Sequence, residues 1–442
     1  MPFSSRQGFL DSGTFTPPGA NMPAYPGVPV YTQYINYLSN CSANSATTLE
    51  SNITTPKFGG IGDITVTHEN GNVYMFPRKD DDNNSDRTRF IGEIEPNGKT
   101  FRLFSPTYPA SFSSEDFKSQ DVLLGSDGNL YGGVQGTAEK HWKYDPVANV
   151  LTVVGSIPVN YAVGVFVRLP NNDHLLVPGR NNTKYRRTIE NSGTYNQVGN
   201  VVVSGAPFGS QNIRNGVLAP NGMVYSAGTG YLDVIKYNPI TNETITLHTF
   251  TESNIGSIAL NNKTAFTCGS IDNTGNVVFG PHQANNYCKI DTTTDTVSFD
   301  RYGLPADYFD LSDNIRLSFG TPLVDGCVFM PNGNILFTPG SSFDTINNTD
   351  YPGNIVEISG SAGTSRIVSS ITPAFTKGAS VGVDGNVYVP IGDNRFPVAP
   401  NPAVDTTFGN TTIVINPNAN TSVNSANTHF TFQLTPVGQS CG

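Results

Sequence analysis

One short phrase recurs seven times along this chain, and it constrains the fold more than any single residue does. Each copy is an apolar stretch, a tight turn built in most copies on Asn-Gly or Asp-Gly, and a second apolar stretch rich in Val, Tyr and Phe. Successive copies lie roughly 45 to 60 residues apart, which is the period of blades in a β-propeller. The turns centre on Gly71, Gly128, Asn172, Gly222, Gly275, Gly333 and Gly385.

The composition favours strands joined by turns. Gly 45, Pro 31 and only 14% charged residues are unfavourable for helices, and no stretch carries a sustained apolar pattern of helical period. We therefore expect an all-β protein in which residues 59–442 form a seven-bladed β-propeller of four-stranded antiparallel blades. All four strands of each blade are expected in sequence order, so that closure needs no borrowed strand.

Residues 1–58 carry no copy of the phrase and are predicted to form an extended, proline-stiffened arm. Its apolar side chains are too numerous for an inert linker, so we expect them to lie along the propeller or a neighbouring protein. The segment from Val28 to Tyr37 could pair with an open strand edge. The expected partner-binding residues are Phe9, Leu10, Phe15, Tyr25, Tyr31, Tyr34 and Tyr37.

Charge and cysteine content exclude several classes of partner. The formal net charge is -10 and there is no run of Lys or Arg, so neither nucleic acid nor an anionic membrane surface is expected as a partner. We expect no membrane insertion and no Sec signal at the start of the chain. The five cysteines show no metal-binding spacing and are expected to be thiols, with pairs Cys268–Cys288 and Cys41–Cys441 as the less favoured alternative.

One face of the predicted propeller is the candidate recognition surface. The turns between the first and second and between the third and fourth strands of each unit are short, whereas the connections between the second and third strands are long and varied. Polar residues follow the second strand of several units and could bind an anionic sugar, carboxylate or phosphate, although strand ends are polar by default. The candidate ligand-binding residues are Arg78, Gln135, Arg180, Thr229 and His282.

No catalytic residue and no cofactor are predicted. The acidic stretch after Arg78 resembles a calcium loop, but Ser85 and Ile91 stand where an EF-hand needs Gly and Glu, so a solvated loop is preferred. Ser380 lies in a G-x-S-x-G string that falls within a strand, where no nucleophile elbow can form. A weak calcium site is left as the alternative, with ligands Asp80, Asp82, Asn84 and Asp86.

The repeats resemble those of known propeller families. Asp384-Gly385-Asn386-Val387-Tyr388-Val389 and Ile91-Gly92-Glu93-Ile94-Glu95-Pro96-Asn97-Gly98-Lys99 are similar to repeats of the NHL-like and streptogramin B lyase-like propellers. The resemblance implies a seven-bladed fold. The lyase-like enzymes use a metal with acidic and histidine side chains at the channel mouth, and only His282 takes a matching place here.

Outside the repeats, the low charge, the Asn-, Thr- and Gly-rich composition and the proline-rich arm resemble structural proteins of virus particles, especially phage capsid decorations, spikes and tail appendages. This resemblance implies a non-enzymatic virion protein that binds other virion proteins through its arm. Its propeller would attach to a host-surface glycan or receptor, or stabilise the shell. Two alternatives stay open: a propeller enzyme acting on a glycan or small cyclic substrate, and a cellular carbohydrate- or protein-binding module.

Overall fold

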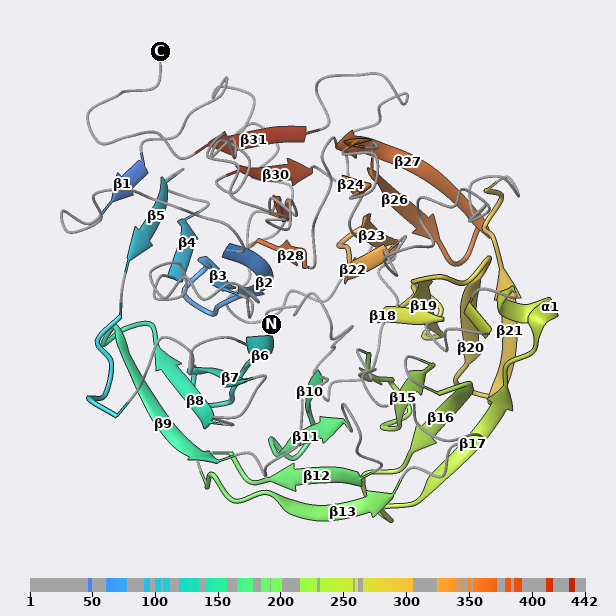
Figure 1. Ribbon diagram of the computed structural model, residues 1–442, viewed down its shortest axis with the longest axis horizontal. Helices are drawn as coiled ribbons and strands as arrows, with labels where there is room; N and C mark the ends of the chain where they lie inside the picture. The colour runs from blue at the N-terminus through green and yellow to red at the C-terminus, as the bar shows by residue number, and fades with distance from the viewer. Residues whose placement is uncertain are drawn as a thin grey trace.

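Each recurring phrase forms an antiparallel hairpin near the centre of a ring of sheets, as the computed structural model shows (Figure 1). From the hairpin, further strands extend each sheet outward to the rim. The structure describes residues 47–49, 61–77, 91–95, 100–104, 106–111, 119–134, 140–156, 165–177, 184–190, 192–200, 215–228, 231–256, 259–260, 265–304, 324–339, 343–344, 349–350, 353–371, 378–382, 385–391, 411–415 and 429–433.

Six sheets are four-stranded, antiparallel and ordered from the centre outward as in the sequence. Three of them are β6 (Ser119–Leu124), β7 (Leu130–Val134), β8 (Lys140–Asp145), β9 (Val150–Ser156); β10 (Val165–Arg168), β11 (His174–Val177), β12 (Lys184–Thr188), β13 (Asn196–Asn200); and β14 (Val217–Leu218), β15 (Val224–Ala227), β16 (Asp233–Tyr237), β17 (Thr244–Thr249). The others are β18 (Phe266–Ile271), β19 (Val277–Pro281), β20 (Tyr287–Asp291), β21 (Thr296–Asp300); β22 (Val324–Phe329), β23 (Ile335–Pro339), β26 (Gly353–Ser359), β27 (Thr364–Ile371); and β28 (Ser380–Val381), β29 (Val387–Ile391), β30 (Thr411–Ile415), β31 (His429–Gln433).

The sheet that contains the first phrase has five strands. Its antiparallel part is β2 (Ile61–Thr67), β3 (Val73–Pro77), β4 (Ile91–Glu95) and β5 (Thr100–Phe104), and β1 (Thr47–Leu49) pairs with β5 in parallel. The predicted all-β propeller with four-stranded antiparallel blades is confirmed, but the structure has six such blades, not seven. The difference arises because β1, from the segment predicted to be an arm, covers the outer edge of β5 and so removes an open strand edge.

The hairpins between the first two strands of each sheet share one turn geometry. In the β14–β15 turn, the Ala219 N–H donates to the Met223 carbonyl at 2.8 Å and the Gly222 N–H donates to the Ala219 carbonyl at 2.9 Å. Gly222 has a φ of 80°, in the left-handed region that glycine adopts without a steric penalty. Asn172, at the equivalent position of the β10–β11 turn, has a φ of 66°. The turn residues picked out from the sequence are therefore those that reverse the chain.

The core lies between neighbouring sheets. Phe76 of β3 packs against Trp142 of β8 with ring centroids 5.5 Å apart, and Tyr185 of β12 stacks on Tyr237 of β16 at 4.2 Å. A Cβ at Gly132 would come within 2.1 Å of the Trp142 indole, so the absence of a side chain there makes room for the tryptophan. Each aromatic pair thus joins two consecutive sheets.

Hydrogen bonds near the centre of the ring also join neighbouring sheets. Asp121 of β6 accepts a hydrogen bond from the Phe166 N–H of β10 at 3.0 Å. Thr67 of β2 donates to the Val381 carbonyl of β28 at 2.6 Å, and β2 also contacts β29, so the first and last sheets are neighbours. Equivalent links join Asn215 to Phe266 and Thr267 to Val324.

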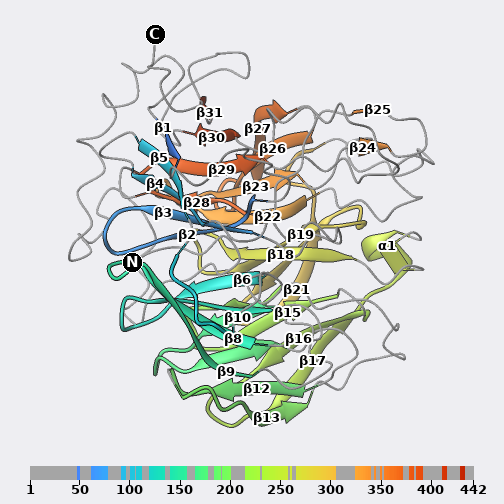
Figure 2. The same cartoon turned by 60° about the vertical axis from the view of Figure 1, so that its left-hand side comes forward.

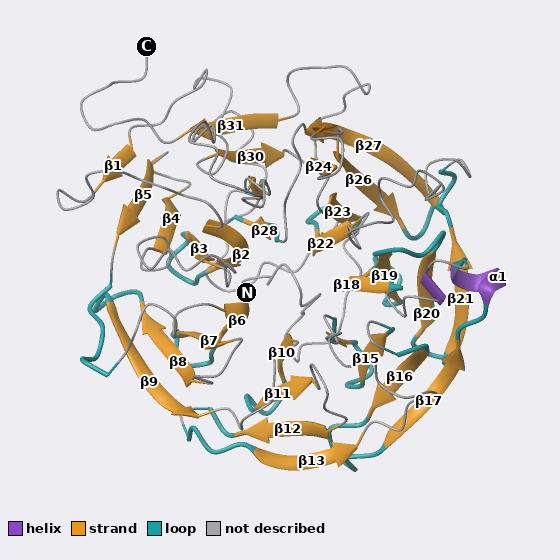
Figure 3. Ribbon diagram, in the orientation of Figure 1, coloured by secondary structure: helices purple, strands orange, loops and turns teal. Residues whose placement is uncertain are grey.

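The described parts of two longer connections lie away from the β2–β3 turn. Figure 2 shows α1 (Glu252–Ile255) and the small hairpin of β24 (Phe343–Asp344) and β25 (Thr349–Asp350) on one side, away from the β2–β3 turn. Figure 3 shows α1 at the rim. No described helix combines the length and the hydropathy needed to cross a membrane.

Replacement of Gly222 by Ala should lower the free energy of unfolding by about 1 kcal/mol, because a side chain in the left-handed region strains the backbone. A Cβ at Gly222 meets no atom within 4 Å, so backbone conformation alone is tested. Gly222→Asn is the matched control and should cost less, since Asn172 occupies the equivalent position. Urea denaturation of the three proteins measures the effect; an equal loss for both variants would contradict this explanation.

Candidate functional site

The predicted ligand-binding residues all follow the second strand of a sheet. Strand β19 ends at Pro281, directly before His282, and His282 is the one of the five that lies in the described part of the chain. Arg78, Gln135, Arg180 and Thr229 lie outside the described residues, shortly after β3, β7, β11 and β15. The possible calcium ligands Asp80, Asp82, Asn84 and Asp86, and the arm residues Phe9, Leu10, Phe15, Tyr25, Tyr31, Tyr34 and Tyr37, also lie outside them.

His282 is fixed at the side of the ring that carries the longer connections. Its backbone N–H donates to the Ala265 carbonyl at 2.7 Å, and only 5% of the residue is exposed. The next residue, Gln283, is also buried. His282 therefore lies in a tightly packed connection, with a small part of its surface open to a ligand.

Amide side chains beside His282 connect this loop to α1. The Asn286 amide donates to the Asn254 carbonyl at 2.8 Å and accepts from Arg301 Nε at 3.1 Å. The Asn285 N–H donates to the Ile255 carbonyl at 3.2 Å. Asn254, Asn285, Asn286 and Arg301 are partly exposed, and amide and guanidinium groups can bind a neutral hydroxylated ligand or a carboxylate. We name Asn254, Asn285, Asn286, Arg301 and His282 the loop-face site.

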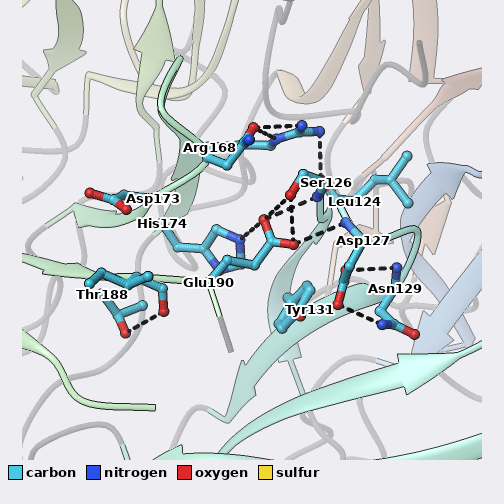
Figure 4. Close-up of polar contacts among 12 residues, drawn as sticks. Leu124, Ser126, Asp127, Asn129, Tyr131, Arg168, Asp173, His174, Thr188 and Glu190 are labelled. Carbon is cyan, nitrogen blue, oxygen red and sulfur yellow. Dashed lines mark hydrogen bonds and ion pairs between the residues drawn. The ribbon is translucent and has the colours of Figure 1, made fainter. Parts of the chain in front are cut away.

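A second polar cluster lies on the opposite side, between the β6–β9 and β10–β13 sheets (Figure 4). The Glu190 carboxylate accepts hydrogen bonds from the backbone N–H groups of Ser126 at 3.0 Å and Asp127 at 3.1 Å, and from the Ser126 hydroxyl at 3.1 Å. The nearest contact between His174 Nε2 and Glu190 Oε2 is 3.5 Å. A Cβ at Gly125 would lie 2.8 Å from Glu190 Oε1, so a glycine there allows the close approach.

These Ser, His and Glu residues do not have the geometry of a Ser-His-acid triad. Ser126 donates to the carboxylate of Glu190 and not to the imidazole of His174, so the imidazole does not stand between the hydroxyl and the acid. Burial raises the pKa of Glu190, but the nearby His174 imidazole and the hydrogen bonds from the Ser126 and Asp127 N–H groups outweigh it, and the net pKa is below its usual value. The carboxylate therefore joins two sheets as an anion, and we name Glu190, Ser126, Asp127 and His174 the inter-sheet clasp.

The sequence analysis singles out neither of two histidines that meet in this region. His174, on β11, and His141, on β8, have imidazole centroids 6.1 Å apart, and both residues are buried. They belong to different sheets, so no spacing in the sequence could signal their contact. Among the described residues, no group of three or more His, Cys, Asp or Glu side chains is placed to hold a metal ion.

Comparison with known proteins identifies the fold alone. No protein-family model matches the sequence, and no curated protein matches it. A streptogramin B lyase structure is similar with a TM-score of 0.52 and 14% identity over 77% of this chain and 93% of that chain. Virginiamycin B lyase from Staphylococcus aureus gives 0.50 and 12% over 77% and 94%, and a protein from Lactobacillus plantarum gives 0.52 and 10% over 78% and 91%. The resemblance to lyase-like propellers is thus confirmed for the architecture.

Glu190→Gln should lower the free energy of unfolding at pH 7 by about 1.5–3 kcal/mol, the usual contribution of hydrogen bonds to a charged group. Because the folded pKa of Glu190 is depressed, its contribution is present above the unfolded pKa and is lost as the pH falls through the folded pKa. Urea denaturation at neutral and acidic pH measures both effects.

Glu243→Gln is the matched control, because Glu243 is exposed and its carboxylate accepts a hydrogen bond from Thr241 within its own turn. It should change stability little. Equal effects of the two substitutions at pH 7 would show that Glu190 does not join the sheets.

Proposed function

We propose that this protein is a non-enzymatic structural component of a virus particle, a capsid decoration, spike or tail appendage anchored by residues 1–58. The observation that carries the proposal is that the reactive side chains of the inter-sheet clasp are used to hold sheets together. Such a ring is a rigid frame, and the connections on the side opposite the clasp are free to vary in length and sequence. The composition and the arm, noted above, support the viral setting.

The arm and the loop-face site are assigned different partners. The aromatic and proline side chains of the arm would be buried against other virion proteins, which offsets the cost of ordering an extended segment. The loop-face site would bind a host-surface glycan or receptor through the Asn285 and Asn286 amides and the Arg301 guanidinium. No nucleic acid and no membrane insertion enter this proposal.

We further propose that the five-stranded sheet completes the annulus as its seventh blade. Its four antiparallel strands have the order of the other blades, and β2 contacts β6 on one side and β28 and β29 on the other. In this view β1 is an addition to a standard blade, made where the arm joins the ring.

Removal of residues 1–46, which leaves β1 in place, should abolish incorporation into particles while the isolated ring keeps its melting temperature. Immunoblotting of purified particles measures incorporation of the full-length and the shortened chain. Circular dichroism of both proteins measures the melting temperature. Full incorporation of the shortened chain would contradict anchoring by the arm. A full-length chain that binds a glycan but is absent from particles would favour the cellular binding module.

An enzyme is the second candidate, because the fold is shared with streptogramin B lyase and His282 lies at the loop face. If it is correct, the full-length protein should consume streptogramin B or a cell-surface glycan, and His282→Ala should reduce the rate by about 100-fold or more, as for loss of a general acid or base. His68→Ala is the control, since His68 lies in the β2–β3 turn, away from the loop-face site, and contacts the Gly128 carbonyl. No turnover by the unaltered protein, or an equal loss in both variants, would exclude this role for His282.

A further inference from the structure

The buried pair of His141 and His174 lies among aromatic side chains. His141 stacks on Phe166 of β10 with centroids 5.6 Å apart and meets the Tyr195 ring edge-on at 5.3 Å. Tyr131 of β7 lies 5.7 Å from His141 and 4.7 Å from His174. Both histidines therefore fill the contact between the β6–β9 and β10–β13 sheets as aromatic core residues.

The two imidazoles differ in the charged group that lies near them. Neither nitrogen of His141 has a hydrogen-bond partner within the part of the chain that the structure describes, and its exposed fraction is 1%. His174 Nε2 lies 3.5 Å from Glu190 Oε2, so a proton on His174 would face a carboxylate. A proton on His141 would face no acceptor and would be next to His174.

The other groups around His141 keep the same charge at mildly acidic pH. Among the residues that the structure describes, the titratable side chains that face the pair are Tyr131 from β7 and Tyr195 and Glu190 from the segment after β12; Phe166 from β10 carries no charge. Burial raises the pKa of Tyr195, so its phenol stays neutral. Glu190 has a lowered pKa and stays an anion in this range.

We propose that His141 is an acid-sensitive switch that holds the two sheets together when its imidazole is neutral and opens their contact when it takes up a proton. Opening would separate the imidazole of His141 from Phe166 and Tyr195 and admit water to the charged ring. The ring would then loosen at one interface while the other sheets stay packed.

The direction of the pH dependence follows from linkage. Burial, and then the neighbouring His174, lower the pKa of His141 well below its usual value. The opened form binds a proton below about pH 6.5, whereas the closed form does not, so acid favours the opened form. The equilibrium constant for opening should rise about tenfold between pH 7.5 and pH 5.5 for this one histidine.

His141→Phe tests the proposal, because phenylalanine keeps the stacking on Phe166 and cannot take a proton. Hydrogen exchange followed by mass spectrometry, expressed as protection factors, should show protection of β8 and β11 falling about tenfold from pH 7.5 to pH 5.5 in the unaltered protein. The fall should be much smaller in His141→Phe. His248→Phe, in another sheet, should respond as the unaltered protein does.

The unaltered protein alone also decides the matter if His141→Phe does not fold. Loss of protection confined to β8, β9, β10 and β11, with β19 and β20 unchanged as an internal reference, supports the switch. An equal loss in all these strands, constant protection at the two pH values, or a full response in a folded His141→Phe variant would overturn it.

Discussion

The packing of each sheet face against the next sheet is the constraint on which the rest of this structure depends. A twisted four-stranded sheet with apolar residues on both faces is stable only when both faces are covered. Phe76 against Trp142 and Tyr185 against Tyr237 show how the largest side chains meet that need between consecutive sheets. Because each sheet covers its neighbour, the series must close, and the hydrogen bond from Thr67 to Val381 marks where it does.

The two sides of the ring use polar groups differently. At the side of the short turns, links between neighbouring sheets recur: Asn221 donates to the Thr292 carbonyl at 2.7 Å, and Lys236 pairs with Asp295 at 2.6 Å. The inter-sheet clasp at Glu190 is another member of this set. At the other side, the Asn286 amide joins its loop to α1. The recognition role that we propose belongs to this second side.

Local sequence patterns predicted the fold well because their causes are local. The turn at Gly222 needs a left-handed residue whatever surrounds it, and the placing of His282 after a strand follows from counting along that strand. The predicted number of strands in the first sheet was wrong, because Thr47–Leu49 has no adjoining turn that marks it as part of a blade. Its pairing with β5 depends on an edge far along the chain.

The sequence by itself determined the repeating hairpins, their turns and the alternation of side chains between the two faces of each strand. Each of these depends on backbone preferences and side-chain order within a few residues. Only the tertiary structure decided which side chains meet across neighbouring sheets. His141 and His174, and Glu190 with the Ser126 turn, come from separate sheets and become neighbours when the ring assembles. Contact between sheets is set by packing over the whole annulus, and no short segment of the chain encodes it.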